Sequence, residues 1–417
     1  MSNKIDFMKL QDIVTFSQGI QVPVEEQFEK QKDNHVRFLR IVDYTRGDVE
    51  PRYIDDPGSK YAVQSNDVIM IRYGEAGRVV RGYEGVIANN LFKITPNNDC
   101  IDKDFLYYSL TSDTMYKKIA NTTQTTGMPA VNFKNLYGLE ISLPQLKEQK
   151  KIAEILSSVD AAIEKTEQVI AKTEEVKKGL MQQLLTKGIG HTEFKQTEIG
   201  EIPVDWKVEI LGDISTITRL AGAEYTDYWN PIEDGNIIAL RGYNIGRNKL
   251  ILDNVEKISD DLSNKLYRSK LFIDDIVFPC VGTIGKAAVI YEDNKFHINQ
   301  NIAKITPNPN IKSEYLVRYL MSDNIRSEIL KYNTSTSQPN VLVGNLRKFK
   351  IIVPSVDEQQ MIASILNNYD KKIDIEFKKL EVLKDLKRGL MQQLLTGKTR
   401  VKEATMYSFL KELGYCE

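Results

Sequence analysis

The chain has 417 residues, of which 41% are hydrophobic and 27% are charged, and its formal net charge is −1. These values are typical of a globular protein of two or three domains, and they exclude a membrane span, because no apolar run approaches the roughly 20 residues that cross a bilayer. Three scattered cysteines and a start without an apolar core exclude a disulfide framework and a signal peptide, so we expect a cytoplasmic protein.

The first 144 residues predict a mixed α/β domain. The β-rich runs RFLRIVDY and DVIMIRYG are bounded by turn residues, which is typical of strands, whereas FLYYSLTSDTMYKKIAN has helical periodicity. Basic and aromatic residues alternate in HVRFLRIVDYTR, and RYGEAGR is a Gly-x-x-Gly turn between arginines. A polar loop, TTQTTGMPAVN, follows the helix.

These segments are candidates for contact with DNA, because arginine can bind guanine bidentately and Asn or Gln can bind adenine. A surface ion pair for each arginine, and a plain surface loop for the polar residues, are the alternatives. The candidates in this block are Arg37, Arg40, Tyr44, Arg46, Arg72, Tyr73, Arg78, Gln124, Thr125, Thr126, Met128 and Asn132.

A long helix is predicted at residues 145–187. It contains no proline and no glycine before Gly179, and Pro144 stands just before it, where proline is tolerated. Apolar residues recur at alternating steps of four and three, which is the 3.5-residue repeat of a coiled-coil seam. The apolar seam residues are Ile152, Leu156, Val159, Ile163, Ile170, Leu180 and Leu184. Thr166, Thr173 and Lys177 fill the remaining seam positions.

The rest of the chain repeats this plan. The octapeptide GLMQQLLT occurs at residues 179–186 and again at residues 389–396, and EQKKIAEILSSVD has its counterpart EQQMIASILNNYD at the same offset of 210. We therefore predict a linker and a second mixed domain at residues 188–353. Its turn VGTIGK lacks the spacing and the Ser/Thr of a nucleotide-binding loop, so we interpret it as a tight turn with one exposed cation. The DNA-contact candidates here are Arg241, Tyr243, Asn244, Arg247, Thr283, Lys286, Ser335, Ser337, Gln338 and Asn340, of which Arg241 matches Arg40.

A second long helix is predicted at residues 354–397, followed by a C-terminal tail at residues 398–417 whose apolar residues suit packing near the first domain. The helix repeats the seam at Ile362, Leu366, Tyr369, Ile373, Leu380, Leu383, Leu390 and Leu394. Because the two helices match, we expect them to bury their seams on each other; the pattern allows either direction, and packing of each helix on its own domain is the alternative. The expected fold is α+β, with two mixed α/β domains, an antiparallel coiled coil and a pseudo-two-fold internal repeat.

The motifs of several enzyme classes are absent from the sequence. It contains no Asn/Asp-Pro-Pro-aromatic methyltransfer motif, no complete phosphate-binding loop with a helicase acid box, and no nuclease carboxylate–lysine cluster. No Cys/His spacing predicts a zinc site, and His297 is interpreted as an ordinary histidine. We expect no catalytic residue, metal or cofactor in this chain. A coiled-coil adaptor that binds only proteins is the alternative to a DNA reader.

Two variable blocks, each followed by a long similar helix that ends in K-x-G-L-M-Q-Q-L-L-T, resemble the specificity subunit of type I restriction–modification systems. The segment TEIGEIPVDWKVEILGDI at residues 197–214 resembles the usual start of a recognition domain in that family, and LPQLKEQKKIAEIL and VPSVDEQQMIASIL resemble the starts of its helices. The first block departs from this pattern, since it begins near Phe7 without the IGEIPVDW lead-in.

The resemblance implies a non-catalytic, DNA-binding subunit of a restriction endonuclease and adenine methyltransferase complex, which serves defence against foreign DNA. Each block would be a target recognition domain for one half of a bipartite, asymmetric site in double-stranded DNA. The helices would form the spacer, and a rod of about 58 Å corresponds to roughly 17 base pairs. Two methyltransferase (modification) subunits, and restriction subunits, would be the partners. S-adenosylmethionine, ATP and Mg²⁺ would belong to those partners.

Overall fold

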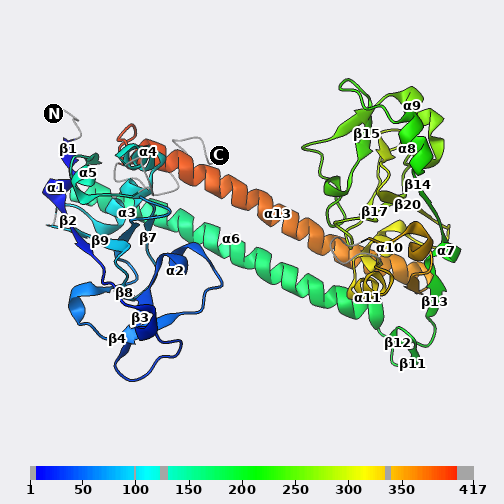
Figure 1. Cartoon of the computed structure of the whole chain (residues 1–417), viewed down its shortest axis with the longest axis horizontal. Helices are drawn as coiled ribbons and strands as arrows, with labels where there is room; N and C mark the ends of the chain where they lie inside the picture. The colour runs from blue at the N-terminus through cyan, green and yellow to red at the C-terminus, as the bar shows by residue number, and fades with distance from the viewer. Residues whose placement is uncertain (1–5, 98–99, 123–129, 334–339, 402–417) are drawn as a thin grey trace. The chain divides into compact units, whose positions relative to one another are not determined.

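The computed structural model describes residues 6–97, 100–122, 130–333 and 340–401. The chain divides into two compact units. The first unit comprises Met1–Gln168 and Lys378–Glu417, and the second comprises Val169–Phe377. Two long helices, α6 (Leu146–Thr186) and α13 (Val356–Leu394), are shared by the units, so that each unit contains the beginning of one helix and the end of the other (Figure 1).

The first unit is built from short strands and helices before α6. Its strands are β1 (Asp6–Lys9), β2 (Val14–Gln18), β3 (His35–Leu39), β4 (Arg52–Asp55), β5 (Ala62–Val63), β6 (Val68–Ile71), β7 (Val79–Val80), β8 (Gly85–Ile87), β9 (Leu91–Pro96) and β10 (Glu140–Leu143). Its helices are α1 (Leu10–Ile13), α2 (Ile41–Thr45), α3 (Lys103–Thr111), α4 (Asp113–Thr122) and α5 (Phe133–Tyr137), with 3₁₀ turns η1 (Val24–Glu26) and η2 (Ser59–Tyr61).

The second unit has a similar order of elements between the long helices. Its strands are β11 (Phe194–Thr197), β12 (Gly200–Pro203), β13 (Lys207–Ile210), β14 (Ser215–Arg219), β15 (Ile237–Leu240), β16 (Glu256–Ile258), β17 (Ile276–Pro279), β18 (Ala288–Val289), β19 (Phe296–Ile298), β20 (Ile302–Pro307) and β21 (Lys350–Val353). Its helices are α7 (Leu211–Ile214), α8 (Gly222–Tyr228), α9 (Asp260–Lys265), α10 (Ser313–Tyr319), α11 (Asp323–Tyr332) and α12 (Val343–Leu346), with η3 (Gly242–Asn244) and η4 (Tyr267–Ser269).

The sheets of the two units follow one plan. An antiparallel sheet has the order β2-β9-β6-β7 in the first unit and β14-β20-β17-β18 in the second. A second sheet contains one parallel pair in each unit, β3 with β8 and β15 with β19, and a two-stranded sheet joins β1 to β10 and β13 to β21. The predicted α+β fold with an internal repeat is confirmed.

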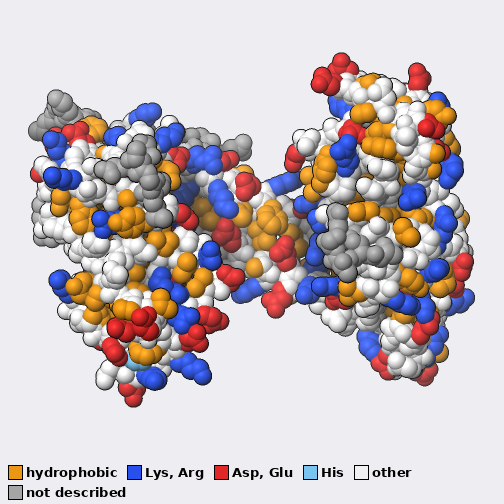
Figure 2. All heavy atoms as spheres, viewed as in Figure 1, with side chains coloured by type: hydrophobic (Ala, Val, Ile, Leu, Met, Phe, Trp, Pro, Cys, Tyr) orange, Lys and Arg blue, Asp and Glu red, His pale blue; other side chains and the backbone are white. Residues whose placement is uncertain are grey.

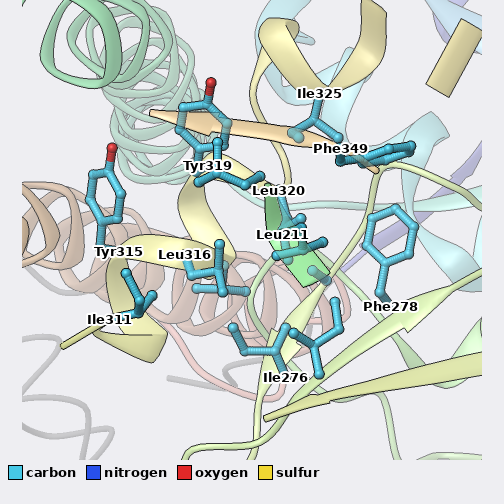
Figure 3. Close-up of a cluster of buried hydrophobic side chains, with 14 of the residues drawn as sticks. Leu211, Ile276, Phe278, Ile311, Tyr315, Leu316, Tyr319, Leu320, Ile325 and Phe349 are labelled. Carbon is cyan, nitrogen blue, oxygen red and sulfur yellow. The ribbon is translucent and has the colours of Figure 1, made fainter. Parts of the chain in front are cut away.

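The core of each unit is sealed by the end of a long helix. In the second unit, side chains of α10 face Leu211, Ile276 and Phe278 (Figure 3), and the same cluster includes Leu184 and Leu185 from the end of α6. The core of the first unit likewise includes the residues at the end of α13 that match them, Leu394 and Leu395. The octapeptide occurs twice because each copy packs matching leucines into the core of one unit.

The long helices run antiparallel within each unit. In the first unit Asp160 pairs with Lys387 at 2.6 Å, and Glu167 pairs with Lys384 at 3.3 Å, so the position on α13 falls as the position on α6 rises. The second unit shows the same order. There Lys177 of α6 pairs with Asp370, and the chain beyond α6 reaches the start of α13, where His191 Nε2 lies 2.9 Å from the carboxylate of Glu358.

The residues of the seam are buried or half-buried along both helices. This holds for Ile152, Leu156, Val159, Ile163, Ile170, Leu180, Leu184, Ile362, Leu366, Tyr369, Ile373, Leu380, Leu383, Leu390 and Leu394. Thr166 and Thr173 are also buried, and their hydroxyls donate to the carbonyls of Ala162 at 2.8 Å and Val169 at 2.6 Å. Because each hydroxyl is satisfied within its own helix, these threonines fit the seam without an unpaired polar group.

Candidate nucleic-acid interface

A groove of about 540 Å³ in the first unit gathers cations and aromatic rings from separate segments. It lies among α2 with the turn after it, β7 with the turn after it, and α3. The residues that line it include Tyr44, Arg46, Arg78, Arg81, Tyr83 and Tyr107. Tyr44, Arg46 and Arg78 are among the sequence-predicted candidates. Arg81, Tyr83 and Tyr107 were missed, although the basic–aromatic alternation that selected residues 37–46 also occurs in RVVRGYEG, residues 78–85.

The rings of the groove make an edge-on contact with each other and contacts with guanidinium groups. The guanidinium of Arg37, on β3, lies 4.4 Å from the ring centroid of Tyr83, and the Tyr44 ring meets Tyr83 edge-on at 5.3 Å. Burial, followed by the nearby Asp43 carboxylate, raises the pKa of Tyr44 above its ordinary value, so the phenol stays neutral. The Arg81 guanidinium lies 3.9 Å from the centroid of Tyr107. Such contacts fix flat donors beside apolar faces, which suits nucleotides.

Two predicted arginines at matching places serve the fold. Arg40 Nε donates to Asp43 at 2.9 Å and its Nη2 donates to the Glu50 carbonyl at 2.9 Å. The Arg241 side chain forms an ion pair with Glu256. For both residues these contacts favour the surface ion pair over a direct contact with a base.

Asn244 is corrected by the structure. It is 0% exposed, and its Nδ2 donates to the carbonyls of Ile251 at 2.8 Å and Asn254 at 2.9 Å. Its Oδ1 accepts the backbone N–H of Arg241 at 3.0 Å. The amide therefore stabilises the loop around η3 and has no group left for a base. The sequence could not reveal this, because an amide in a loop that pairs with its own backbone has the same local pattern as one that pairs with DNA.

The Gly-x-x-Gly turns lie next to the residues that follow the polar loops. In the first unit Tyr73 forms a β-bridge with Ala130, and the Val131 N–H donates to the Arg72 carbonyl at 3.0 Å. In the second unit Val281 bridges Asn340 in the same manner. The candidates within the loops, Gln124, Thr125, Thr126, Met128, Ser335, Ser337 and Gln338, lie outside the described residues. Asn132 is exposed and also caps α5, since its Oδ1 accepts the Lys134 N–H at 3.0 Å.

In the second unit, two turns that are about 40 residues apart in sequence come together. Thr283 Oγ1 donates to the Gly242 carbonyl at 3.1 Å, and Arg247 forms a parallel bridge with Ala287, the residue after Lys286. Tyr243 is 49% exposed, and Arg247 and Thr283 are also exposed. The structure thus brings together the two turns that carry Tyr243, Arg247, Thr283 and Lys286, whereas Asn244 is buried within its own loop.

The charges on the surface are mixed. Over the described part of the face in Figure 2, cationic and anionic side chains alternate on both units, in keeping with a net charge of −1. Within residues 6–97, 100–122, 130–333 and 340–401, no group of three or more His, Cys, Asp or Glu residues is placed to hold a metal ion. No helix in those ranges is long and apolar enough to cross a membrane.

Comparison with known proteins gives the family. The sequence profile of the type I restriction modification DNA specificity domain matches residues 3–175 and again residues 203–385, which is most of the chain. The chain belongs to this family. The chain is 30% identical to the type I restriction enzyme MjaVIII specificity subunit of Methanocaldococcus jannaschii, over 95% of this chain and 93% of that protein. It is 25% identical to the EcoBI specificity subunit of Escherichia coli, over 81% of this chain and 73% of the other.

Solved structures of the specificity family share the fold. The S subunit of the type I restriction–modification system from M. genitalium superposes with a TM-score of 0.59 at 17% identity, covering 95% of this chain and 97% of that one. A chain from a structure of the assembly and conformational transition of a type I system gives a TM-score of 0.54 at 16% identity, covering 95% of this chain and all of the other.

Proposed function

We propose that this chain is the DNA sequence-specificity subunit of a type I restriction–modification complex. The observation that carries the proposal is one fold used twice with unlike surfaces. The cores, the order of the four-stranded antiparallel sheet and the helix ends of the two units match. The side chains on and beside their turns differ: Tyr44, Tyr83 and Tyr107 line a groove in the first unit, whereas Tyr243 and Thr283 are exposed in the second. Two units with the same fold and different exposed side chains suit a bipartite DNA site whose two halves differ in sequence.

The paired long helices would set the distance between the half-sites. Helix α6 has 41 residues, which at 1.5 Å per residue is about 61 Å. B-DNA rises about 3.4 Å per base pair, so this length matches roughly 18 base pairs. Lengthening or shortening both helices by the same number of turns would change the non-specific spacer and leave the half-sites intact.

Methylation and cleavage would be supplied by partners. The antiparallel helix pair offers two equivalent surfaces, which suits two copies of a methyltransferase subunit, with restriction subunits added in the complete complex. S-adenosylmethionine, ATP and Mg²⁺ would be bound by those subunits. Because the chain itself is close to neutral, a share of the phosphate contacts that give affinity would also come from them.

The test is sequencing of the methylated positions in a methylation-free host that expresses this chain with its methyltransferase partner. We expect one split, asymmetric motif. Exchange of residues 1–144 for the corresponding block of another member of the family should change one half of that motif and keep the other half and the spacer. A change in both halves, or in neither, would contradict the proposal. An adaptor without DNA readout would yield no motif that depends on this chain.

A further inference from the structure

The two units share a seven-residue turn that begins and ends with arginine. It runs from Arg40 to Arg46 in the first unit and from Arg241 to Arg247 in the second, and both copies follow a strand, β3 or β15. In both copies the backbone N–H of the first arginine is bound by the side chain at the fourth position. Asp43 accepts it at 2.8 Å and Asn244 accepts it at 3.0 Å. The common cap gives the two turns a common start. The first turn then continues as α2 and the second as η3, and each ends with an arginine six residues after the capped one.

The first and last arginines of the turn differ in what they contact. Each first arginine is engaged by a carboxylate, Asp43 for Arg40 and Glu256 for Arg241. Each last arginine is exposed, and among the described residues the side chains of Arg46 and Arg247 form no hydrogen bond, ion pair or ring contact. Exposed guanidinium groups without an internal partner keep all five donors available for a ligand.

No other predicted arginine has this property. Arg37 lies over Tyr83, Arg72 lies over Tyr73 at 5.0 Å, and Arg78 pairs with Glu75. Of the seven arginines selected from the sequence, five therefore have an internal partner, and the two without one occupy the same position in the two copies. The two arginines without an internal partner among the described residues thus share their place in the repeat, which suits a role toward a ligand outside the chain.

The surroundings of the two arginines also match. Arg46 shares its groove with Arg78, which follows Gly77 of the first Gly-x-x-Gly turn. Arg247 bridges the residue after Lys286, which follows Gly285 of the second turn. The glycines of these turns have nearly equal left-handed φ angles, +77° and +89° for Gly74 and Gly77, and +79° and +89° for Gly282 and Gly285. Each unit thus places a free arginine beside a second cation on a turn of fixed shape.

Within the proposed function, on which this inference rests, we infer that Arg46 and Arg247 are the matched base-reading residues, one for each half-site, and that each binds the O6/N7 edge of a guanine in the major groove. A guanidinium fits that edge with two parallel hydrogen bonds, which is the commonest specific arginine contact. The neighbouring Arg78 and Lys286 act on the backbone, where a single cation contacts a phosphate without regard to sequence.

The experiment uses the assembled methyltransferase complex and compares sequenced methylation motifs and DNA affinity for wild type, R46A, R46K, R247A and R247K. R46A should relax one guanine position in one half-site, with discrimination at that base reduced roughly 5- to 150-fold, and R247A should do the same in the other half-site. R46K and R247K should also lose discrimination while keeping the dependence of affinity on salt, because lysine retains the charge but not the bidentate fork.

The matched controls are R78A and K286A, which should weaken binding to all sequences and lower the salt slope by about one. If the wild-type complex has a bipartite motif and R46A and R247A leave every position unchanged, the inference is wrong while the proposed function stands. Full specificity in the lysine variants would assign the two arginines to phosphates and would also overturn it. If the wild-type complex has no motif, the failure lies with the proposed function.

Discussion

At the start of each long helix, a glutamate binds the chain that follows the end of the other long helix, and its partners differ between the two units. Glu148 and Glu358 are 210 residues apart, each in the first turn of a long helix. Glu358 accepts the Trp206 Nε1–H at 2.8 Å and the Ile189 N–H at 2.9 Å. Glu148 also accepts a backbone N–H, that of Val401 at 3.1 Å, but its side-chain partner is Arg400, with Nε at 2.8 Å and Nη2 at 2.6 Å from its two oxygens. Ile189 and Arg400 lie on the segments that directly follow the end of the other helix, and Trp206 comes after the β11–β12 hairpin.

The difference shows that a repeated fold can keep a glutamate at the same position while the free energy that this residue contributes to folding changes. Trp206 is 1% exposed, so its indole N–H has no water to replace a lost acceptor. The Arg400 side chain is 33% exposed and can be hydrated when its partner is removed. A buried donor left without an acceptor costs more than a surface charge left without its counterion. We therefore expect the second unit to depend more strongly on its glutamate.

The largest effect is expected from E358A compared with E148A. E358A should reduce the free energy of unfolding of the second unit by about 3 kcal/mol, because the indole and a backbone N–H lose a charged acceptor. E148A also removes an acceptor from a backbone N–H, that of Val401, but Val401 and Arg400 are half-buried and can be hydrated, so the first unit should lose about 1 kcal/mol. Hydrogen exchange followed by mass spectrometry measures the two units separately in the intact chain. Equal losses in the two units would remove the distinction between the buried and the exposed partner.

A second matched pair lies further along the helices, at Asp370 and Asp160. Asp370 pairs with Arg318, which is 2% exposed, at 2.6 Å, whereas Asp160 accepts the Tyr108 hydroxyl at 2.8 Å. D370N should destabilise the second unit by about 2 kcal/mol, because it leaves a buried guanidinium without its counterion. D160N should cost about 1 kcal/mol or less, since an amide oxygen still accepts from Tyr108. Chemical denaturation combined with exchange of unit-specific peptides gives both values, and a larger loss for D160N would reverse the comparison.

The smallest expected effect is a dependence of the stability of the second unit on pH, caused by the buried His297. Burial lowers the pKa of His297 below its ordinary value of 6.5, and the positive Lys304 and Lys270 act in the same direction. As the pH falls through 6.5 the unfolded chain binds a proton that the folded unit does not, so the second unit loses stability below that pH. The loss is at most about 1.4 kcal/mol per pH unit.

The check is to compare the stability of the second unit at pH 7.5 and pH 5.5 in wild type and in H297N. The asparagine variant is less stable overall, but it should lose the part of the pH dependence that His297 supplies. An unchanged pH dependence in H297N would show that other groups control it.

Local patterns predicted the long helices and their seam well. The 3.5-residue repeat identified Ile152 and Leu366 as seam residues, because the periodicity of a helix can be recognised in one continuous stretch of sequence. The matching sequences of the two helices also favoured their pairing with each other. The direction of that pairing was open from the pattern alone. The direction depends on the path of the chain after each helix. The contact that reveals it, between Glu358 and Ile189, joins residues 169 positions apart, so no local pattern contains it.

The reading surfaces were less predictable, because they depend on contacts between segments that are distant in sequence. The groove of the first unit joins three separate segments, which is why Arg81 and Tyr107 were missed. Arg40 and Arg46 are alike as letters in one basic–aromatic run, and only the position of Asp43 separates an arginine that supports the fold from one that remains exposed. Candidates within the two polar loops remain predictions.

The double use of GLMQQLLT has a consequence for mutational tolerance. Leu184 and Leu394 are both buried, as are Leu185 and Leu395, and Met181 and Met391 are both half-buried. Each copy meets the same steric demands in a different unit, so a saturation scan of one octapeptide should forecast the scan of the other, position by position. An intact copy cannot compensate for a substitution in the other copy, because each octapeptide packs in the core of a different unit.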